Sequence, residues 1–302
     1  NGARALDVSP LKAKRLVNLD SEEEGIFLFG CAGGARVNIN YPYVQKKRRG
    51  FSFEINVCGL QGGHSGEEIH KERGNAICLM GRVLNKLLRK MDLCIADIEG
   101  GVADNAIPSS VKAHILVTGY ENKNGRQKMQ QGEFSEQECV ALLKHTCDKL
   151  ESELKQELAD KDRGVRIEVS AMQVEEMDVI EEEEAGRLIS LINTLPYGVQ
   201  AMSSAMPGLV ETSLNPGLLY MKDGIAGIGI SVRSSLEGAK RALIGKLLSL
   251  AHLAGAETEV TGEYPGWTYR KESPLRDKMI EVYRELYHEE PVIKAIHAGV
   301  EC

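Results

Sequence analysis

The chain has 302 residues, of which 42% are hydrophobic and 27% charged, the balance of a soluble globular protein long enough for two domains. Its formal net charge of −7 argues against a nucleic-acid-binding surface, so we expect no nucleic-acid partner. No apolar run approaches the ~18 to 20 residues that span a bilayer, and the start lacks the segments of a signal peptide, so we expect no membrane partner.

Strand-like patterns dominate the first sixty residues. Four segments are apolar or alternate with period two: 15–20, 25–33, 35–44 and 50–60. We interpret the basic run "QKKRRG" between the last two as a solvated loop. The first strand runs into "LDSEEEG", whose acids form either a solvated turn or, at Asp20, a metal ligand.

Helical spacing begins after "GGHSG", from about Glu67, where apolar residues recur at three and four positions. The segments that follow are a strand at 93–101, a strand at 111–120, a helix at 134–160, a strand at 164–175 and a helix opened by four acids at 181–184. Ser135 and Glu138 are spaced as a capping box at the start of the 134–160 helix.

The last third predicts a hairpin and two helices. Residues 217–235 form the hairpin with Asp-Gly at its turn, followed by a helix at 236–254 and a strand at 256–267. A final helix begins at Ser273 as N-cap with Pro274 at the first helical position.

The order of these elements is that of two loosely similar β-α-β-β-α halves. It predicts an α/β protein in which an α+β domain at 38–266 is inserted between two segments of a second domain, 1–37 and 267–302.

Cysteine usage indicates a reducing compartment. The seven cysteines are an odd number without a CxxC pair, and Cys58 and Cys78 lie in apolar runs. No local partner activates a thiol, so we expect buried, reduced cysteines and a cytoplasmic protein.

Six motifs carry a resemblance to a known family. In chain order they are "LVNLDSEEEG" with "GCAGG", "GLQGGHSGEEIH", "GGVADNAIP", "ISVRSS", "YPGW" and "IHAGVEC". This order resembles the aminoacyl-histidine dipeptidases, also called Xaa-His dipeptidases or peptidase D, of the di-zinc clan that includes aminoacylases and carnosinases. The resemblance covers essentially the whole chain. It implies fragments of a di-zinc peptidase catalytic α/β domain with a parallel-type sheet, carrying an inserted lid at 38–266.

The resemblance implies two zinc ligands, Asp20 and His297. An aspartate at the carboxyl end of a strand can reach a metal at ~2 Å, and a histidine before Ala-Gly can present its imidazole to a metal. The alternatives are that Asp20 only caps the turn and that His297 is a hydrogen-bonded core histidine.

Three lid residues are implied to act on the substrate. His64 in "GGHSG" matches a histidine that stabilises the oxyanion, in many clan members from the partner subunit. Asn105 in "DNAIP" matches a donor to the substrate carboxylate or carbonyl, and Arg233 in "SVRSS" matches the arginine that binds the substrate carboxylate. The alternatives are turn residues for His64 and Asn105 and a solvated arginine at a strand end.

These matches predict a cytoplasmic metallo-dipeptidase that hydrolyses short peptides, with Xaa-His dipeptides as the expected substrates, by means of a water activated by two Zn²⁺ ions. Mn²⁺ or Co²⁺ can substitute in such a site, and a homodimer through the lid is expected. The matches leave the general base and several ligands outside this chain, so we expect it to be a fragment that is inactive alone. Alternatives are a non-catalytic lid-type dimerisation module, or an aminoacylase or tripeptidase of the same clan.

Overall fold

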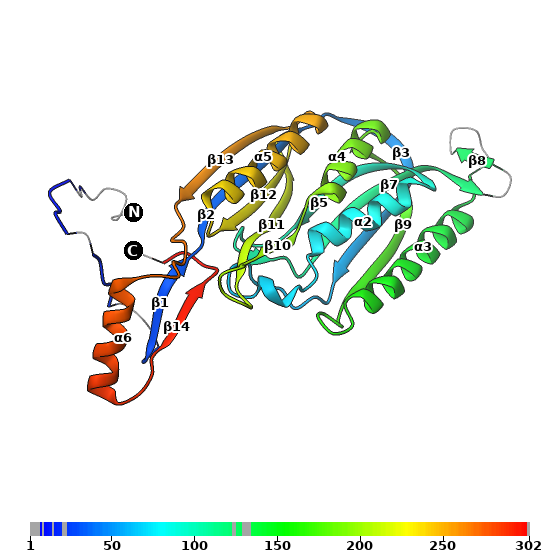
Figure 1. The fold of residues 1–302 in the computed structure, drawn as a ribbon. Coiled ribbons are helices and arrows are strands. Elements are labelled where there is room, and N and C mark those ends of the chain that lie inside the picture. Colours follow the sequence, from blue (N-terminus) through cyan, green and yellow to red (C-terminus); the bar gives the residue numbers. More distant parts are fainter. Residues whose placement is uncertain are drawn as a thin grey trace.

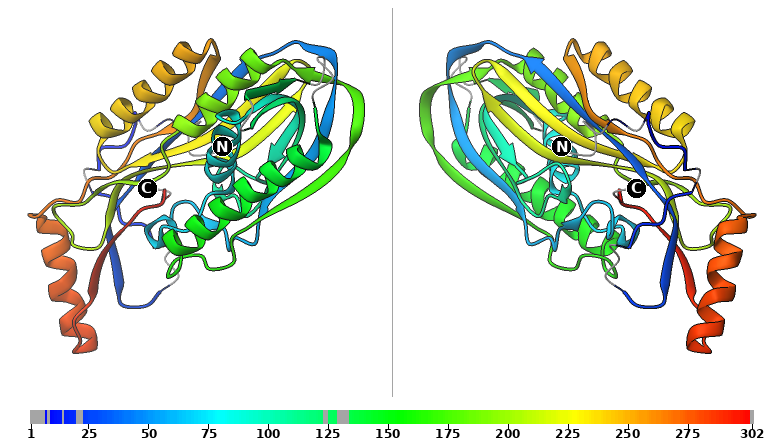
Figure 2. Two further views of the ribbon diagram at one scale, coloured as in Figure 1. Left: turned by 90° about the vertical axis from the view of Figure 1, so that its right-hand side faces the viewer. Right: turned by 90° about the vertical axis from the view of Figure 1, so that its left-hand side faces the viewer.

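The structure is a computed structural model that describes residues 7, 9–13, 15–19, 23–122, 125–128 and 134–300. A ten-stranded sheet with helices packed against it forms the larger part (Figure 1). A two-stranded sheet and the helix α6 (Pro274–Tyr287) lie at one end of it, as both views in Figure 2 show. No helix among the described residues is long and apolar enough to cross a membrane.

The large sheet is antiparallel in every pairing between its described strands. Its strands are β2 (Gly33–Pro42), β3 (Gln45–Cys58), β5 (Met91–Gly100), β7 (Val111–Asn122), β8 (Gly125–Lys128), β9 (Arg166–Ile180), β10 (Gly198–Met202), β11 (Val210–Lys222), β12 (Ile225–Ser234) and β13 (Glu257–Tyr264). They run in the order β13-β2-β12-β11-β5-β9-β3-β7-β8, with β10 on β11 and a further pairing of β5 with β7.

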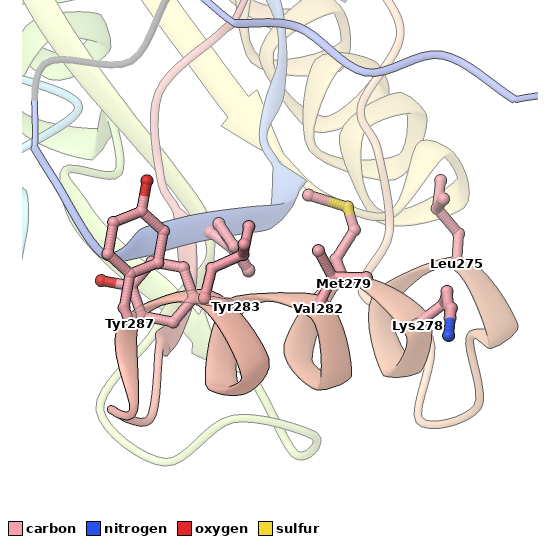
Figure 3. A pocket seen from close by; sticks show the side chains of 8 residues that line it. Leu275, Lys278, Met279, Val282, Tyr283 and Tyr287 are labelled. Atoms are coloured by element: carbon pink, nitrogen blue, oxygen red, sulfur yellow. The ribbon is translucent and has the colours of Figure 1, made fainter.

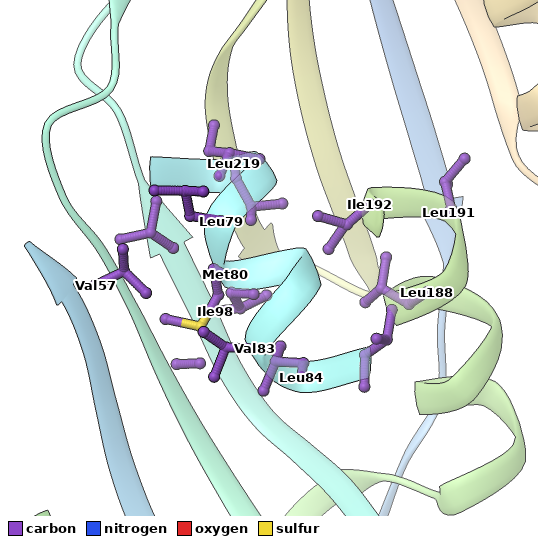
Figure 4. Close-up of a cluster of buried hydrophobic side chains, with 14 of the residues drawn as sticks. Val57, Leu79, Met80, Val83, Leu84, Ile98, Leu188, Leu191, Ile192 and Leu219 are labelled. Atoms are coloured by element: carbon purple, nitrogen blue, oxygen red, sulfur yellow. The ribbon is translucent and has the colours of Figure 1, made fainter. Parts of the chain in front are cut away.

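The helices against this sheet are α2 (Ala76–Leu88), α3 (Glu136–Glu157), α4 (Glu182–Thr194) and α5 (Glu237–Ala254). One continuous core joins them to the sheet, and in Figure 4 the α2 residues Met80, Val83 and Leu84 lie between the strands and the apolar side of α4. All three α2 residues are at most 1% exposed, because the apolar positions of α2 recur at helical spacing.

Two β-α-β-β-α halves follow one another in this fold, as predicted. The first is β3-α2-β5-β7-α3, with further short elements at 63–64, 69–71, 106–107 and 125–128, and the second is β9-α4-β11-β12-α5, with the short β10 before β11. The predicted α/β class is therefore confirmed. The predicted lid boundaries at 38 and 266 stay a prediction, and β2 enters the large sheet already at Gly33.

The small sheet pairs the first strand of the chain with the last. β1 (Ile26–Cys31) lies parallel to β14 (Val292–Ile296), and α6 (Pro274–Tyr287) packs beside them through an edge-on contact of Phe27 with Tyr283 at 5.6 Å between ring centroids. Ser273 caps α6 as predicted, since its hydroxyl accepts from the Arg276 N–H. An open, largely apolar hollow lies along α6, as seen in Figure 3.

Three predicted elements are corrected. Residues 15–19 are not a strand, because Leu16, Val17 and Leu19 are 52 to 89% exposed and no described strand pairs with them. The "QKKRRG" run is not a loop but the first part of β3. Its basic residues stay exposed, yet the backbone pairs with the acidic end of β9, where Lys47 lies opposite Asp178 and Arg49 opposite Glu176.

The third correction concerns the helix expected from Glu67. A short 3₁₀ helix, η1 (Ile69–Lys71), comes first, and α2 begins at Ala76. Asn75 sets this start, because its side-chain oxygen accepts from the backbone N–H groups of Ile77 and Cys78.

Candidate functional site

His297 follows β14 and is only 7% exposed. Its Nε2 lies 2.6 Å from the Ser213 hydroxyl, while its buried Nδ1 has no hydrogen-bond partner among the described atoms. Burial, and then the charge of Arg233, lower the pKa of His297 to about 4, and the nearby Val210 backbone opposes this lowering to a smaller extent. The imidazole is therefore neutral at pH 7, the form in which histidine binds metals.

Arg233 lies directly opposite Ser213 in the pairing of β12 with β11. Residues opposite one another in a sheet present their side chains to the same face. Nη1 of Arg233 donates to the Tyr264 hydroxyl at 3.1 Å, whereas its Nε is buried without a partner among the described atoms. The guanidinium therefore keeps a donor available on the face that carries Ser213.

His64 is held by a two-stranded ribbon, β4 (Gly63–His64) with β6 (Ala106–Ile107), in which His64 lies opposite Ala106. Its Nδ1 accepts from the Glu67 backbone N–H at 3.1 Å. Since Nδ1 accepts, the proton of the neutral ring is on Nε2, and the ring can donate from that atom. His64 is thus oriented as a hydrogen-bond donor.

Glu68 fixes the turn that carries His64. Its Oε2 accepts from the His64 backbone N–H at 2.9 Å, and its Oε1 pairs with Lys71 at 2.7 Å and Arg73 at 3.2 Å. The hydrogen bond from Lys71 and then that from His64 lower the pKa of Glu68 to about 2. The carboxylate therefore stays charged and keeps the turn in place down to acidic pH.

Gly66 is the point where these groups meet. A Cβ at this position would lie 2.9 Å from the His297 carbonyl oxygen, 3.1 Å from His64 Cε1 and 3.3 Å from Arg233 Cζ. Such distances leave no room for a side chain without displacing a neighbour, so glycine permits the close approach of the three predicted residues.

Asn105 lies next to His64 through its backbone. Its carbonyl oxygen accepts from the Ser65 N–H at 2.9 Å, and the residue itself is exposed. The loop on either side is tied to β11, because the Asn215 side-chain amide donates to the carbonyls of Asp104 and Ala106 at 3.2 and 2.8 Å. Asn105 is thereby kept beside the turn that carries His64.

The structure thus brings His64, Arg233 and His297 together, with the Asn105 loop beside His64. Asp20 lies outside the described residues. Within the described ranges there is no group of three or more His, Cys, Asp and Glu residues that could hold a metal. Sequence reasoning missed Ser213 and Asn215, because the first part of β11, "VETSLNPG", mixes polar and apolar residues without a clear period.

Comparison with known proteins defines the class. Residues 55–134 match the family model M20_dimer, described as a peptidase dimerisation domain. Residues 55–134, from within β3 to just before α3, are therefore similar to a peptidase dimerisation domain.

Two similar proteins are dipeptidases. The chain is 36% identical over 304 residues to the cytosol non-specific dipeptidase of Escherichia coli (strain K12), covering 100% of this chain and 59% of that protein. The crystal structure of aminoacylhistidine dipeptidase from Vibrio alginolyticus matches with a TM-score of 0.85 and 31% identity, covering 99% of this chain and 58% of that one. The resemblance to dipeptidases that the motifs indicated is confirmed, and the chain spans less than two thirds of the length of either relative.

Proposed function

We propose that these residues belong to a metal-dependent dipeptidase in which His297 binds the metal and the lid binds the substrate. The observation that carries the proposal is the state of His297. It is a buried, neutral imidazole with one ring nitrogen lacking a partner, and the Arg233 guanidinium lies near enough to affect its pKa. A buried polar atom without a partner is costly in a purely structural histidine, and a metal would satisfy it.

The residues fit a zinc site in their chemistry. Neutral imidazole nitrogen and carboxylate oxygen are ordinary Zn²⁺ ligands, and Asp20 is the second ligand that the family resemblance suggests. When bound, a pair of Zn²⁺ ions polarises the scissile carbonyl and lowers the pKa of a bound water. Mn²⁺ or Co²⁺ can occupy such a nitrogen and oxygen site as well.

The chain's own residues would then bind and orient the peptide. Nε2–H of His64 would donate to the oxygen of the scissile carbonyl as negative charge develops there. The free Nε–H of Arg233 would donate to the terminal carboxylate of the substrate, a geometry that guanidinium favours. Asn105 would supply a further donor from the loop beside His64.

This arrangement suits a short peptide with a free carboxylate. An arginine near the metal ligand sets the distance between the carboxylate and the scissile bond, and this favours dipeptides over longer chains. We infer Xaa-His dipeptides as preferred substrates from the structural relative, which is an aminoacylhistidine dipeptidase. A cytoplasmic location and a homodimer through the lid complete the proposal.

The 302 residues supply only Asp20 and His297 among the ligand positions that the resemblance assigns. We therefore expect this chain by itself to bind zinc weakly and to hydrolyse no dipeptide. A His297→Ala variant purified in the same way is the contamination control. Dipeptidase activity of the purified chain that persists in this variant comes from contaminants. Activity that is lost in the variant would disprove the expected inactivity.

The experiment that tests the function uses the longer protein that contains this chain. Its rates of hydrolysis are compared for four substrate classes: Xaa-His dipeptides, other dipeptides, tripeptides and N-acyl amino acids. Each rate is measured before and after the metal is removed with a chelator. We expect dipeptides to be cleaved fastest and activity to return with Zn²⁺. A preference for N-acyl amino acids or tripeptides would assign another reaction of the same clan, and chelator-resistant activity would exclude the metal mechanism.

A further inference from the structure

We propose that Tyr264 is a positioning residue for Arg233, whose guanidinium it holds through one nitrogen so that the Nε side remains for the terminal carboxylate of the substrate. The inference rests on the proposed function and deepens it, because it names the residue that fixes the orientation of the carboxylate-binding arginine. Tyr264 is the first residue of the "YPGW" motif, none of whose residues takes part in the steps described so far.

The side chains of Tyr264 and Arg233 meet across a glycine. Gly34 on β2 lies opposite Tyr264 of β13 on one side and opposite Arg233 of β12 on the other, where these three strands are neighbours at one edge of the large sheet (Figure 1). Opposite residues present their side chains to the same face, so a glycine between them leaves this face open. A Cβ on Gly34 would lie 2.6 Å from Cε1 and from the hydroxyl oxygen of Tyr264. The ring therefore lies across Gly34, and its hydroxyl comes within 3.1 Å of Nη1 of Arg233.

The ring of Tyr264 is confined on a second side by the segment that follows His297. A Cβ on Gly299 would lie 2.9 Å from Cε2 and 3.0 Å from the hydroxyl oxygen of Tyr264. Both distances are shorter than an ordinary contact of about 3.5 Å, so the Gly299 backbone packs closely against the ring. The tyrosine hydroxyl therefore lies next to both the arginine and the segment that carries His297.

The backbone of Tyr264 is anchored separately from its ring. Nζ of Lys240 on α5 donates to the Tyr264 carbonyl at 3.0 Å and pairs with Glu237 at 3.0 Å and Glu263 at 3.7 Å. Lys240 is 2% exposed, and a buried ammonium requires such partners. Because both the ring and the carbonyl of Tyr264 are held, its hydroxyl is a fixed point to which the longer, more flexible side chain of Arg233 adjusts.

This hydrogen bond decides which side of the guanidinium is left for a ligand. A guanidinium binds a carboxylate through two parallel N–H groups, taken either from its two Nη atoms or from Nε and one Nη. Tyr264 engages Nη1, whereas Nε of Arg233 is buried without a partner among the described atoms. A substrate carboxylate on the Nε side would satisfy this donor, and the tyrosine would hold the guanidinium in the orientation that this pairing needs.

A chemical-modification experiment on the chain tests the contact without measuring activity. Phenylglyoxal, which attacks the Nη atoms of arginine, is applied to the wild type and to Tyr264→Phe, and the modified Arg233 peptide is followed by mass spectrometry. We expect Arg233 to react about fivefold faster in the variant, the factor that corresponds to the loss of a hydrogen bond of average strength. Equal rates would show that the hydroxyl does not hold the guanidinium.

The matched control is Tyr220→Phe on β11. Tyr220 also lies across a glycine, because it is opposite Gly227 on β12 and a Cβ on Gly227 would meet its ring. It lies close to the turn of the β11–β12 hairpin, at the other end from Arg233. Removal of its hydroxyl should leave the modification rate of Arg233 unchanged. The same acceleration in both variants would indicate a general loosening of the sheet and would contradict a specific role of Tyr264.

Steady-state kinetics of the longer protein test the consequence for the substrate. Tyr264→Phe keeps the ring between the two glycines and removes only the hydroxyl. We expect KM for dipeptides to rise about 10-fold and kcat to change less than about threefold, because a weakened hydrogen bond to a charged group lowers affinity by such a factor. An unchanged KM, or a loss confined to kcat, would overturn the proposal. A wild type that hydrolyses no dipeptide would refute the proposed function, while the modification rates still decide whether Tyr264 holds Arg233.

A double-mutant cycle separates positioning of the arginine from a general loss of structure. Affinity for a dipeptide analogue with a reduced peptide bond, which is not hydrolysed, is measured by calorimetry for the wild type, Tyr264→Phe, Arg233→Lys and the double variant. Since lysine has no fork to orient, removal of the hydroxyl should weaken binding about 10-fold in the wild type and less than about twofold in Arg233→Lys. Equal losses in both backgrounds would show that Tyr264 does not act through Arg233.

Discussion

Ser213 and His297 are 84 residues apart in the chain, yet the serine hydroxyl lies 2.6 Å from Nε2 of the histidine. The contact ties the segment after β14 to the middle of the large sheet. It defines the orientation of the ring, because the other ring nitrogen then points to a buried place without a partner among the described atoms. Groups that hold a metal-binding histidine by its second nitrogen raise its affinity for the metal.

Removal of this hydroxyl should therefore weaken metal binding. In the longer protein we expect Ser213→Ala to lower Zn²⁺ affinity roughly 10- to 100-fold, the usual effect of removing such a partner. Ser213→Thr keeps the hydroxyl and is the control, with a smaller loss expected. Competition with a chromogenic chelator measures the affinity, and an unchanged affinity in Ser213→Ala would show that the contact does not orient the ligand.

A methyl group at position 66 should disturb the site. Gly66→Ala places a Cβ 2.9 Å from the His297 carbonyl oxygen, so the turn with His64 or the segment with His297 must move. We expect a loss of catalytic efficiency of about 100-fold in the longer protein, as small misplacements of reacting groups cause.

The control for Gly66 is Gly186 on α4, where a Cβ would meet nothing within 4 Å. Gly186→Ala should stabilise the helix by about 0.5 to 1 kcal/mol and leave activity unchanged. Thermal unfolding and steady-state kinetics of both variants make the comparison. Equal activity in the two variants would contradict the close packing around Gly66.

The Glu68 carboxylate should make a pH-dependent contribution to stability. Its pKa in the folded protein is about 2, below the ordinary 4.5, because of hydrogen bonds from Lys71 and the His64 N–H. Since the folded value is the lower one, the stabilisation is complete above about pH 4.5 and is lost as the pH falls toward 2.

The comparison with Glu68→Gln isolates this contribution. The melting temperature of the wild-type chain should exceed that of the variant at pH 6, and the difference should shrink steadily between pH 4.5 and the lowest pH at which both remain folded. Thermal scans across this range measure it. A difference that stays constant with pH would mean that the carboxylate is not held by these partners.

Asn215 should be required for the stability of the lid. It is 1% exposed and hydrogen bonds with Asn75, Asp104 and Ala106. Asn215→Ala removes one hydrogen bond from each of these three partners, and a buried polar group left unpaired costs about 1 to 3 kcal/mol.

We therefore expect Asn215→Ala to reduce the free energy of unfolding by at least ~2 kcal/mol in urea titrations. The matched control is Asn56→Ala on β3, where the side-chain amide donates an exposed hydrogen bond to Glu168 at 3.2 Å. This control should change the free energy by less than ~0.5 kcal/mol. Similar values for both variants would show that the buried network contributes little.

Local chemistry made many elements predictable. The Asp-Gly turn of the β11–β12 hairpin followed from the sequence, because Asp223 and Gly224 take φ values of 51° and 77° that suit these residue types.

Only one of the two hydrogen bonds of the predicted capping box is formed at the start of α3. Ser135 accepts from the Glu138 N–H, but the Glu138 carboxylate accepts from Tyr120. The hydroxyl of Tyr120, distant in sequence, accepts from the Ser135 N–H instead.

Other features needed partners that are remote in the chain. The first part of β3 has no apolar alternation, and it is a strand because its basic residues lie beside the acidic end of β9, with Lys46 and Arg48 also paired to Glu181. The segment 15–19 has a strand-like pattern but no partner among the described strands. A strand depends on its neighbours for hydrogen bonds, so its pattern alone does not decide its state.

By itself, the sequence determined most element types and the α/β class, because helix and strand periods are local properties of the chain, and the family resemblance of its motifs supplied the candidates His64, Arg233 and His297. Only the tertiary structure decided that these residues converge, that Ser213 holds the imidazole and that Gly66 must be small. The register of β11 against β12 and the packing of distant turns set these contacts, and neither is encoded in the residues next to them.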